Sequence, residues 1–120
     1  MLNLDTHIVL FMLGNTLTAT EQSLIREETC GISQIVLWEI ANLSLLGRIN
    51  LGLDDPEFVA LLGDLHEWPV SVEVCRRIRD LDFDSDPADE IIAATSLAHG
   101  VPLLTRDKRI RRSAVVPLAG

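Results

Sequence analysis

The sequence predicts an α/β fold in which helices cover both faces of a central parallel sheet, as a three-layer α/β/α sandwich. Two observations indicate this class. Short apolar segments alternate along the chain with longer segments of helical character, and the segments between successive strands are long enough for parallel crossovers. The 120 residues show neither an internal repeat nor an internal boundary. We therefore expect a single domain over residues 1–120.

The first elements are short and follow one another closely. We expect a strand at Leu2–Leu4 that leads directly into a helix at Thr6–Leu13. A loop then precedes a second helix at Thr20–Glu28, which Thr20 and Glu21 can open. Cys30–Ser33 is a brief candidate strand.

The middle of the chain contains the strongest helix signal. Gln34–Leu46 is almost entirely apolar, and Gly47 gives it a natural end. We expect a loop or short strand at Arg48–Asp55, a helix at Pro56–Leu65 and a strand at Trp68–Val72. The next expected helix, Glu73–Leu81, has a basic face.

A capped helix followed by a buried strand dominates the last third. Asp86 and Pro87 are typical of a helix start, and Gly100 ends the helix. Val101–Leu104 is a short apolar run that suits a buried parallel strand. A short basic helix from Asp107 and a last strand at Ala114–Val116 complete the expected elements.

Composition limits the compartment and the partners. With 48% apolar residues the chain is globular, and the isolated cysteines Cys30 and Cys75 favour reduced thiols in a cytoplasmic protein. We see neither a secretory signal nor a membrane span. The net charge of −8 taken alone argues against a nucleic-acid partner. However, half of the ten basic residues cluster near the end: Arg106, Lys108, Arg109, Arg111 and Arg112.

Four acids are candidates for one metal site. Asp5 and Asp107 follow candidate strands, Asp89 lies at a helix start, and Glu39 borders an apolar helical stripe. Clustered carboxylates repel one another unless a hard cation such as Mg²⁺ or Mn²⁺ neutralises them. Each acid also has a purely structural explanation, as a helix cap or, for Glu39, as the partner of an arginine such as Arg48.

The sequence resembles the PIN-domain ribonuclease toxins of the VapC type. The resemblance covers essentially the whole chain and depends on the order and spacing of several motifs. These are LDTH (Leu4–His7), SQIVLWEIA (Ser33–Ala41), GRI (Gly47–Ile49), WPVS (Trp68–Ser71), DPADEIIAATSLAHGVPLLTRD (Asp86–Asp107) and VVPL (Val115–Leu118).

The resemblance implies a metal-dependent endoribonuclease, the toxin of a type II toxin–antitoxin system, which uses Mg²⁺ or Mn²⁺ to activate water. By position, the family's acidic ligands match Asp5, Glu39, Asp89 and Asp107. Its accessory positions match Asp86, Thr6, Thr105 and Ser33. The resemblance also implies a homodimer and a cognate antitoxin that occludes the acidic groove, often with an inserted basic side chain.

Several residues near these motifs have more than one interpretation. Glu90 stands where related proteins commonly carry arginine, and His7 where many have asparagine. His7 is a candidate for RNA contact or proton transfer, with a helix-start residue that contacts the backbone as the alternative. The basic residues from Arg106 to Arg112 are candidates for RNA binding, with a solvated surface helix as the alternative. Trp38 and Trp68 lie in apolar segments, so we expect core roles rather than stacking on bases.

Two rival functions remain open at this stage. A receiver-like phospho-acceptor module would use Asp5, Asp54 or Asp55, and Lys108. Against it, Asp55 does not close an apolar strand and no second acid accompanies Asp5. The other rival is a PIN fold that binds RNA or a partner without cutting.

Overall fold

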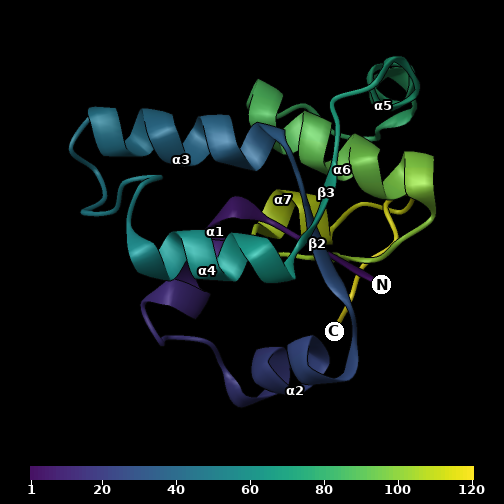
Figure 1. Ribbon diagram of the computed structural model, residues 1–120. Coiled ribbons are helices and arrows are strands. Elements are labelled where there is room, and N and C mark those ends of the chain that lie inside the picture. Colours follow the sequence, from purple (N-terminus) through teal and green to yellow (C-terminus); the bar gives the residue numbers. More distant parts are fainter.

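A four-stranded parallel sheet forms the centre of the computed structural model, which describes residues 1–120 (Figure 1). The strand order is β3-β2-β1-β4, and every neighbouring pair is parallel. The strands are β1 (Leu2–Leu4), β2 (Cys30–Ser33), β3 (His66–Trp68) and β4 (Leu103–Leu104). The predicted α/β class with a parallel sheet is confirmed.

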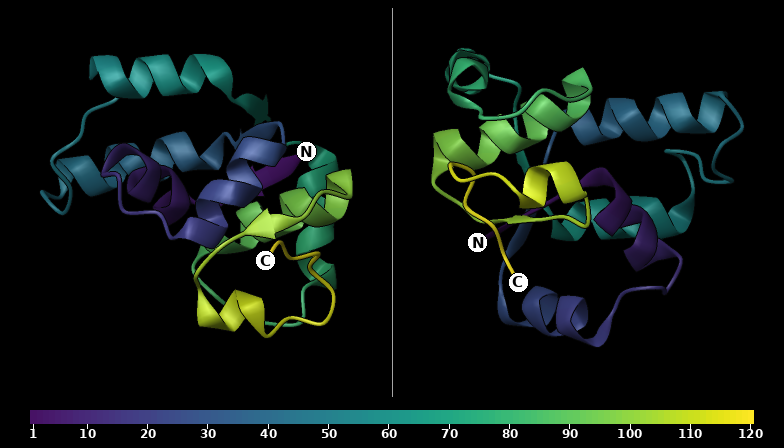
Figure 2. Two further views of the ribbon diagram at one scale, coloured as in Figure 1. Left: turned by 90° about the horizontal axis from the view of Figure 1, so that it is seen from below. Right: turned by 180° about the vertical axis from the view of Figure 1, so that it is seen from behind.

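Helices pack on both sides of this sheet. Helices α5 and α6 lie together on one side, and α1, α2 and α4 lie on the other (Figures 1 and 2). The helices are α1 (Thr6–Leu13), α2 (Ala19–Glu27), α3 (Ile35–Leu45), α4 (Pro56–Asp64), α5 (Val72–Arg77), the 3-10 turn η1 (Ile78–Asp80), α6 (Pro87–His99) and α7 (Lys108–Arg111). No helix combines the length and the apolar character needed to cross a membrane.

Strand β1 is tied to its neighbours by both packing and polar contacts. Leu2 and Leu4 are buried in the core, which also takes side chains from β2 and β4 and from α1, α3, α4, α6 and α7. Between them, Asn3 is fully buried, and its amide nitrogen donates to the Ile92 carbonyl at 3.1 Å and to the Ser96 hydroxyl at 3.0 Å. These bonds fix α6 against the central strand, which sets the position of the first turn of α6.

Strands β2 and β3 approach so closely that one position requires glycine. A Cβ atom on Gly31 would lie 2.8 Å from the His66 carbonyl oxygen and 2.8 Å from the Trp68 ring. The register pairs Gly31 with His66 and Ser33 with Trp68. The indole of Trp68 therefore covers the backbone of β2.

Several predicted boundaries differ from the structure. The strand predicted at Trp68–Val72 instead occupies His66–Trp68, because Pro69 has no N–H group to extend the ladder. Helix α2 begins before Thr20, because the Thr18 hydroxyl and Glu21 form a capping box. The strand predicted at Val101–Leu104 is confined to its last two residues. The helix predicted at Glu73–Leu81 is divided into α5 and the 3-10 turn η1.

The strand predicted at Ala114–Val116 is wrong. The Asp82 carboxylate accepts the Ala114 N–H at 2.7 Å, and the Ser113 hydroxyl accepts the N–H groups of Val115 and Val116 at 3.2 and 3.1 Å. Side chains thus take the donors that a strand would need. One isolated bridge between Leu103 and Leu118 follows.

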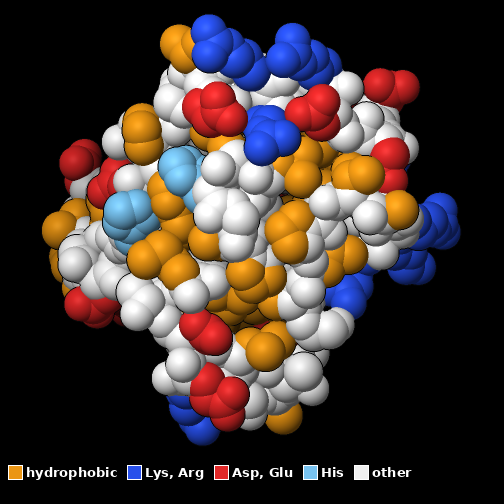
Figure 3. Space-filling view, turned by 90° about the vertical axis from the view of Figure 1, so that its right-hand side faces the viewer, with side chains coloured by type: hydrophobic (Ala, Val, Ile, Leu, Met, Phe, Trp, Pro, Cys, Tyr) orange, Lys and Arg blue, Asp and Glu red, His pale blue; other side chains and the backbone are white.

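The two tryptophans have opposite environments. Trp68 is buried as expected, stacked on His99 at 5.7 Å and edge-on to His66 at 4.9 Å between ring centroids. Figure 3 shows histidine side chains next to hydrophobic ones on the side of the molecule that it presents. The core role predicted for Trp38 is wrong, since this residue of α3 is 57% exposed.

Cys30 and Cys75 are both free thiols.

Candidate active site

Five acidic side chains line one pocket of about 400 Å³: Asp86 and the four candidate metal ligands. Asp5 follows β1 and caps α1, and Asp107 follows β4 and caps α7. Because β1 and β4 are parallel neighbours, their carboxyl ends bring these two acids to the same edge. Glu39 reaches the pocket from α3 and Asp89 from the first turn of α6. The structure therefore brings together the four acids that the sequence singled out.

Hydroxyl groups orient the two carboxylates that are closest to the sheet. The Thr105 hydroxyl donates to Asp5 Oδ2 at 2.5 Å, and the Thr6 N–H donates to Asp5 Oδ1 at 2.8 Å. The Thr6 hydroxyl donates to a carboxylate oxygen of Glu39. Thr105 also accepts the Asp107 N–H at 3.0 Å. Thr6 and Thr105 thus connect the acids through a chain of hydrogen bonds.

The three acids at the start of α6 have different contacts. The Ser85 hydroxyl donates to Asp89 Oδ2 at 2.9 Å, which holds that carboxylate in place. Glu90 accepts the Ser85 N–H at 3.1 Å, so its side chain links the first turn of α6 to the residue before the helix cap. The side chain of Asp86 makes no capping bond and lines the pocket.

The electrostatics of the pocket disfavour negative charge. Burial raises the pKa of Asp5 above its ordinary value, against the lowering effect of hydrogen bonds from Thr105 and Thr6. Burial also raises the pKa of Glu39, and the charge of Asp5 adds to the effect. For Asp89, burial and the charges of Asp5, Glu39 and Asp107 raise the pKa to about 6. Burial and mutual repulsion therefore make the ionised forms of these carboxylates unfavourable, and the charge of a bound cation would stabilise them.

The donor set fits a hard divalent cation. All four candidate ligands are carboxylates, and Mg²⁺ and Mn²⁺ prefer oxygen. As the side chains stand, no three His, Cys, Asp or Glu residues are arranged to hold an ion together. The reason lies in the contacts above, since Asp5, Glu39 and Asp89 face hydroxyls and Asp107 accepts the Ile110 N–H at 3.0 Å. Ion binding therefore requires side-chain rotation within the pocket.

The remaining predicted site residues are divided between the pocket and the scaffold. His7 and Arg106 line the pocket, with Phe11 behind them. Ser33 is fully buried, and its hydroxyl accepts the Ile35 N–H at 3.3 Å, so it supports the start of α3 and does not line the pocket.

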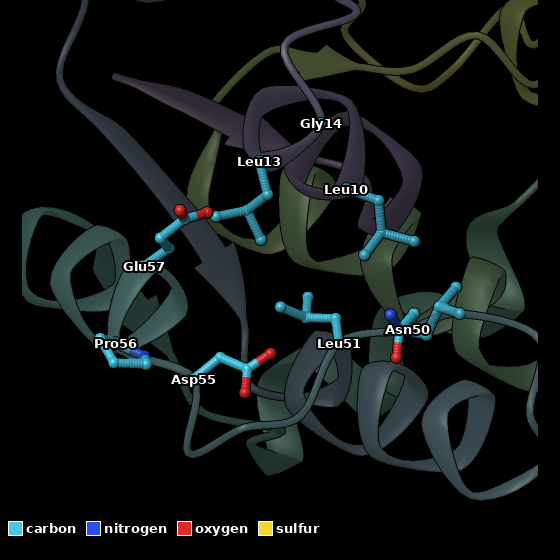
Figure 4. Close-up of a pocket in the computed structure, with 9 residues that line it drawn as sticks. Leu10, Leu13, Gly14, Asn50, Leu51, Asp55, Pro56 and Glu57 are labelled. Atoms are coloured by element: carbon cyan, nitrogen blue, oxygen red, sulfur yellow. The ribbon is translucent and has the colours of Figure 1, made fainter.

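A second cavity contains none of the four clustered acids. Its volume is about 720 Å³, and it lies between α1, the loop before α4 and the start of α4 (Figure 4). Figure 4 shows Leu10, Leu13 and Leu51 around it, with Asp55 at one side. Neither Asp54 nor Asp55 lines the pocket of Asp5. The acidic constellation of a receiver-like module is therefore not assembled.

Three residues of the site were missed in the sequence. Ser85 orients Asp89, and its place directly before the helix cap was the available signal. Phe11 and Glu21 hold Arg106: the guanidinium lies 3.8 Å from the Phe11 ring centroid, and its Nη2 is 2.7 Å from Glu21 Oε1. No local pattern relates Glu21 to a residue 85 positions away.

Comparison with known proteins agrees with this architecture. Residues 3–116 match the PIN domain family, and the chain belongs to that family. Within it, the chain is similar to ribonuclease VapC22 of Mycobacterium tuberculosis, with 30% identity over 97 residues that cover 78% of this chain and 74% of the relative. The resemblance to the VapC type is confirmed.

Solved structures show the same fold at low sequence identity. VapBC2 from Rickettsia felis, bound to a DNA fragment from its promoter, superposes with a TM-score of 0.77 at 18% identity, over 98% of this chain and 96% of that one. A toxin–antitoxin complex from Klebsiella pneumoniae gives a TM-score of 0.72 at 15% identity, over 99% and 97%. At these identities the similarity establishes the fold.

Proposed function

We propose that this protein is a metal-dependent endoribonuclease and the toxin of a type II toxin–antitoxin pair. The observation that carries the proposal is the convergence of four carboxylates from the β1–α1 junction, α3, α6 and the β4–α7 junction on one pocket. The similarity to a protein named ribonuclease VapC22 supports RNA as the substrate. No comparable assembly supports the receiver-like alternative.

In this proposal Asp5, Glu39 and Asp89 hold Mg²⁺ or Mn²⁺, and Asp107 assists. The ion, when bound, supplies a Lewis acid that activates water and neutralises charge on a phosphodiester. The chain's own hydroxyls hold these carboxylates: Thr105 donates to Asp5 and Thr6 donates to Glu39. Ser85 donates to Asp89, so rotation of these side chains toward the ion would accompany its binding.

The proposal includes a protein partner. Among the structural neighbours is a toxin–antitoxin complex, which supports a cognate antitoxin for this chain. The acidic pocket suits an inserted basic side chain of that partner, which would pair with Asp86 or Asp89 and block access. A homodimer and an action on cytoplasmic RNA belong to the same proposal.

Cleavage of single-stranded RNA by the purified protein tests the proposal. We expect cleavage with Mg²⁺ or Mn²⁺, none in EDTA, and at least a hundredfold loss in Asp5→Asn. Asp54→Asn is the matched control, because Asp54 is exposed and lies outside the pocket. Equal cleavage by wild type and Asp5→Asn would contradict the assignment.

Thermal unfolding supplies a readout that does not depend on activity. Mg²⁺ or Mn²⁺ is expected to raise the Tm of the wild-type protein by mass action, and to do so much less in Asp5→Asn. An identical rise in both proteins would argue against a metal site at these carboxylates.

A further inference from the structure

The basic residues between positions 106 and 112 are not equivalent in the structure. Arg106 is occupied by its ion pair with Glu21 and by the ring of Phe11. Arg111 donates to the carbonyl oxygens of Thr105 at 3.2 Å and Gly120 at 2.6 Å. Both arginines therefore have partners within the chain.

Lys108 and Arg112 differ, because both are exposed and neither takes part in any of the four ion pairs of the molecule. Neither side chain donates a hydrogen bond within the chain. Arg109 is intermediate: one of its nitrogens donates to the Asp84 carbonyl at 2.7 Å, which fixes it beside the other two.

These cations line a hollow of about 490 Å³ that has no hydrophobic lining residue. Lys108, Arg109 and Arg112 contribute basic side chains to it, and Asp86, Asp89 and Asp107 contribute carboxylates. The three carboxylates also line the candidate active site, so the two hollows share a wall.

We propose that this hollow binds a phosphodiester group of the RNA strand next to the one being cut, with Lys108 and Arg112 as its ligands. The inference rests on the proposed function and extends it to the path of the substrate. Free guanidinium and ammonium groups are the side chains that bind phosphate. The hollow has no aromatic or apolar surface for a base, so the contact is with the backbone and is independent of sequence.

Charge explains why such a subsite is needed. The chain carries a net charge of −8, and its pocket is lined by carboxylates. A metal ion offsets this charge only at the reacting phosphate, so neighbouring phosphates would be repelled. Two unpaired cations directly beside the carboxylates supply attraction where the strand continues.

Binding of fluorescein-labelled single-stranded RNA, measured by anisotropy between 50 and 200 mM salt, tests the subsite. The measurement uses the full chain with Asp5→Asn as a non-cleaving background. We expect Lys108→Gln and Arg112→Gln each to weaken binding by about threefold to fivefold. Each should also make the slope of log affinity against log salt shallower by about 0.7, and the double variant by about 1.4. Two unrelated RNA sequences should lose the same amount.

Arg26→Gln is the matched control, because Arg26 is exposed on α2 and lines neither hollow. It removes the same charge and should leave the salt slope unchanged. A double variant that binds RNA like the control overturns the subsite, even where the wild-type protein cleaves RNA. Weaker binding by the double variant supports the subsite even where no cleavage occurs, in which case the proposed nuclease activity alone fails. Absence of RNA binding by every form overturns both.

Discussion

Replacing Asp89 with asparagine is expected to stabilise the metal-free protein while abolishing RNA cleavage. The Asp89 carboxylate is partly buried among Asp5, Glu39 and Asp107, which raises its pKa to about 6 from 3.8. By linkage this difference corresponds to about 3 kcal/mol of destabilisation at neutral pH. Because the side chain is partly exposed, solvent screening reduces the figure to about 1–2 kcal/mol. Asparagine keeps an oxygen that accepts the Ser85 hydroxyl and removes the charge.

The sign of the pH dependence follows from the raised pKa. Below about pH 3.8 the carboxyl is protonated in both the folded and unfolded states, so Asp89 does not lower the free energy of unfolding. Between about pH 3.8 and pH 6 the carboxyl is ionised in the unfolded state but still protonated in the folded state, so wild type loses stability relative to Asp89→Asn over this range. The advantage of the variant should therefore be largest above pH 6 and nearly absent at pH 4.

Urea denaturation in EDTA at pH 7.5 and pH 4 measures both effects. We expect a gain of about 1–2 kcal/mol at pH 7.5, or a Tm higher by about 3–8 °C. Asp54→Asn should change stability by less than about 0.5 kcal/mol at either pH. A variant that is less stable than wild type at pH 7.5, or a gain that persists at pH 4, would refute the electrostatic reasoning.

Three further predictions test the scaffold. Glu21→Gln should lower the free energy of unfolding by about 1 kcal/mol at pH 7. The hydrogen bond from Arg106 lowers the pKa of Glu21 to about 2, so the stability that the ionised Glu21 contributes is present above pH 4.5. The urea midpoints of variant and wild type should converge as the pH falls towards 2. Gly31→Ala should lower the Tm and destabilise by at least about 2 kcal/mol through its backbone contact, whereas Gly63→Ala, with open space around its Cβ, should stabilise α4 by about 0.5–1 kcal/mol. Trp38→Ala should change the unfolding free energy by less than about 0.5 kcal/mol for the isolated chain, because the indole is 57% exposed; a loss of 3 kcal/mol or more would show that it is packed.

The acidic constellation was predictable because it depends on chain geometry more than on side-chain partners. Asp5 and Asp107 each follow a strand, and parallel neighbours present their carboxyl ends at one edge. Glu39 was marked by its apolar surroundings on a helix, where an isolated charge needs an explanation. The capped start of the helix that carries Asp89 was visible in Asp86 and Pro87.

The roles of the basic residues and of Trp38 were not predictable, because they depend on contacts between distant segments. Arg106 was grouped with its neighbours as a candidate for RNA binding, and no local pattern indicated that it also pairs with Glu21 on α2. The failed strand at Ala114–Val116 has the same origin, since Asp82 and Ser113 take its N–H groups. Apolar composition put Trp38 in the core, yet the exposed side of α3 carries it.

The hydrogen bond between Thr105 and Asp5 joins residues 100 positions apart. During translation, Asp5 and Glu39 leave the ribosome long before β4 is synthesised. The unfinished polypeptide therefore has its first carboxylate without the hydroxyl that orients it, and it has no Asp107 at all. The candidate site is therefore complete only after β4 and the residues that follow it have been synthesised.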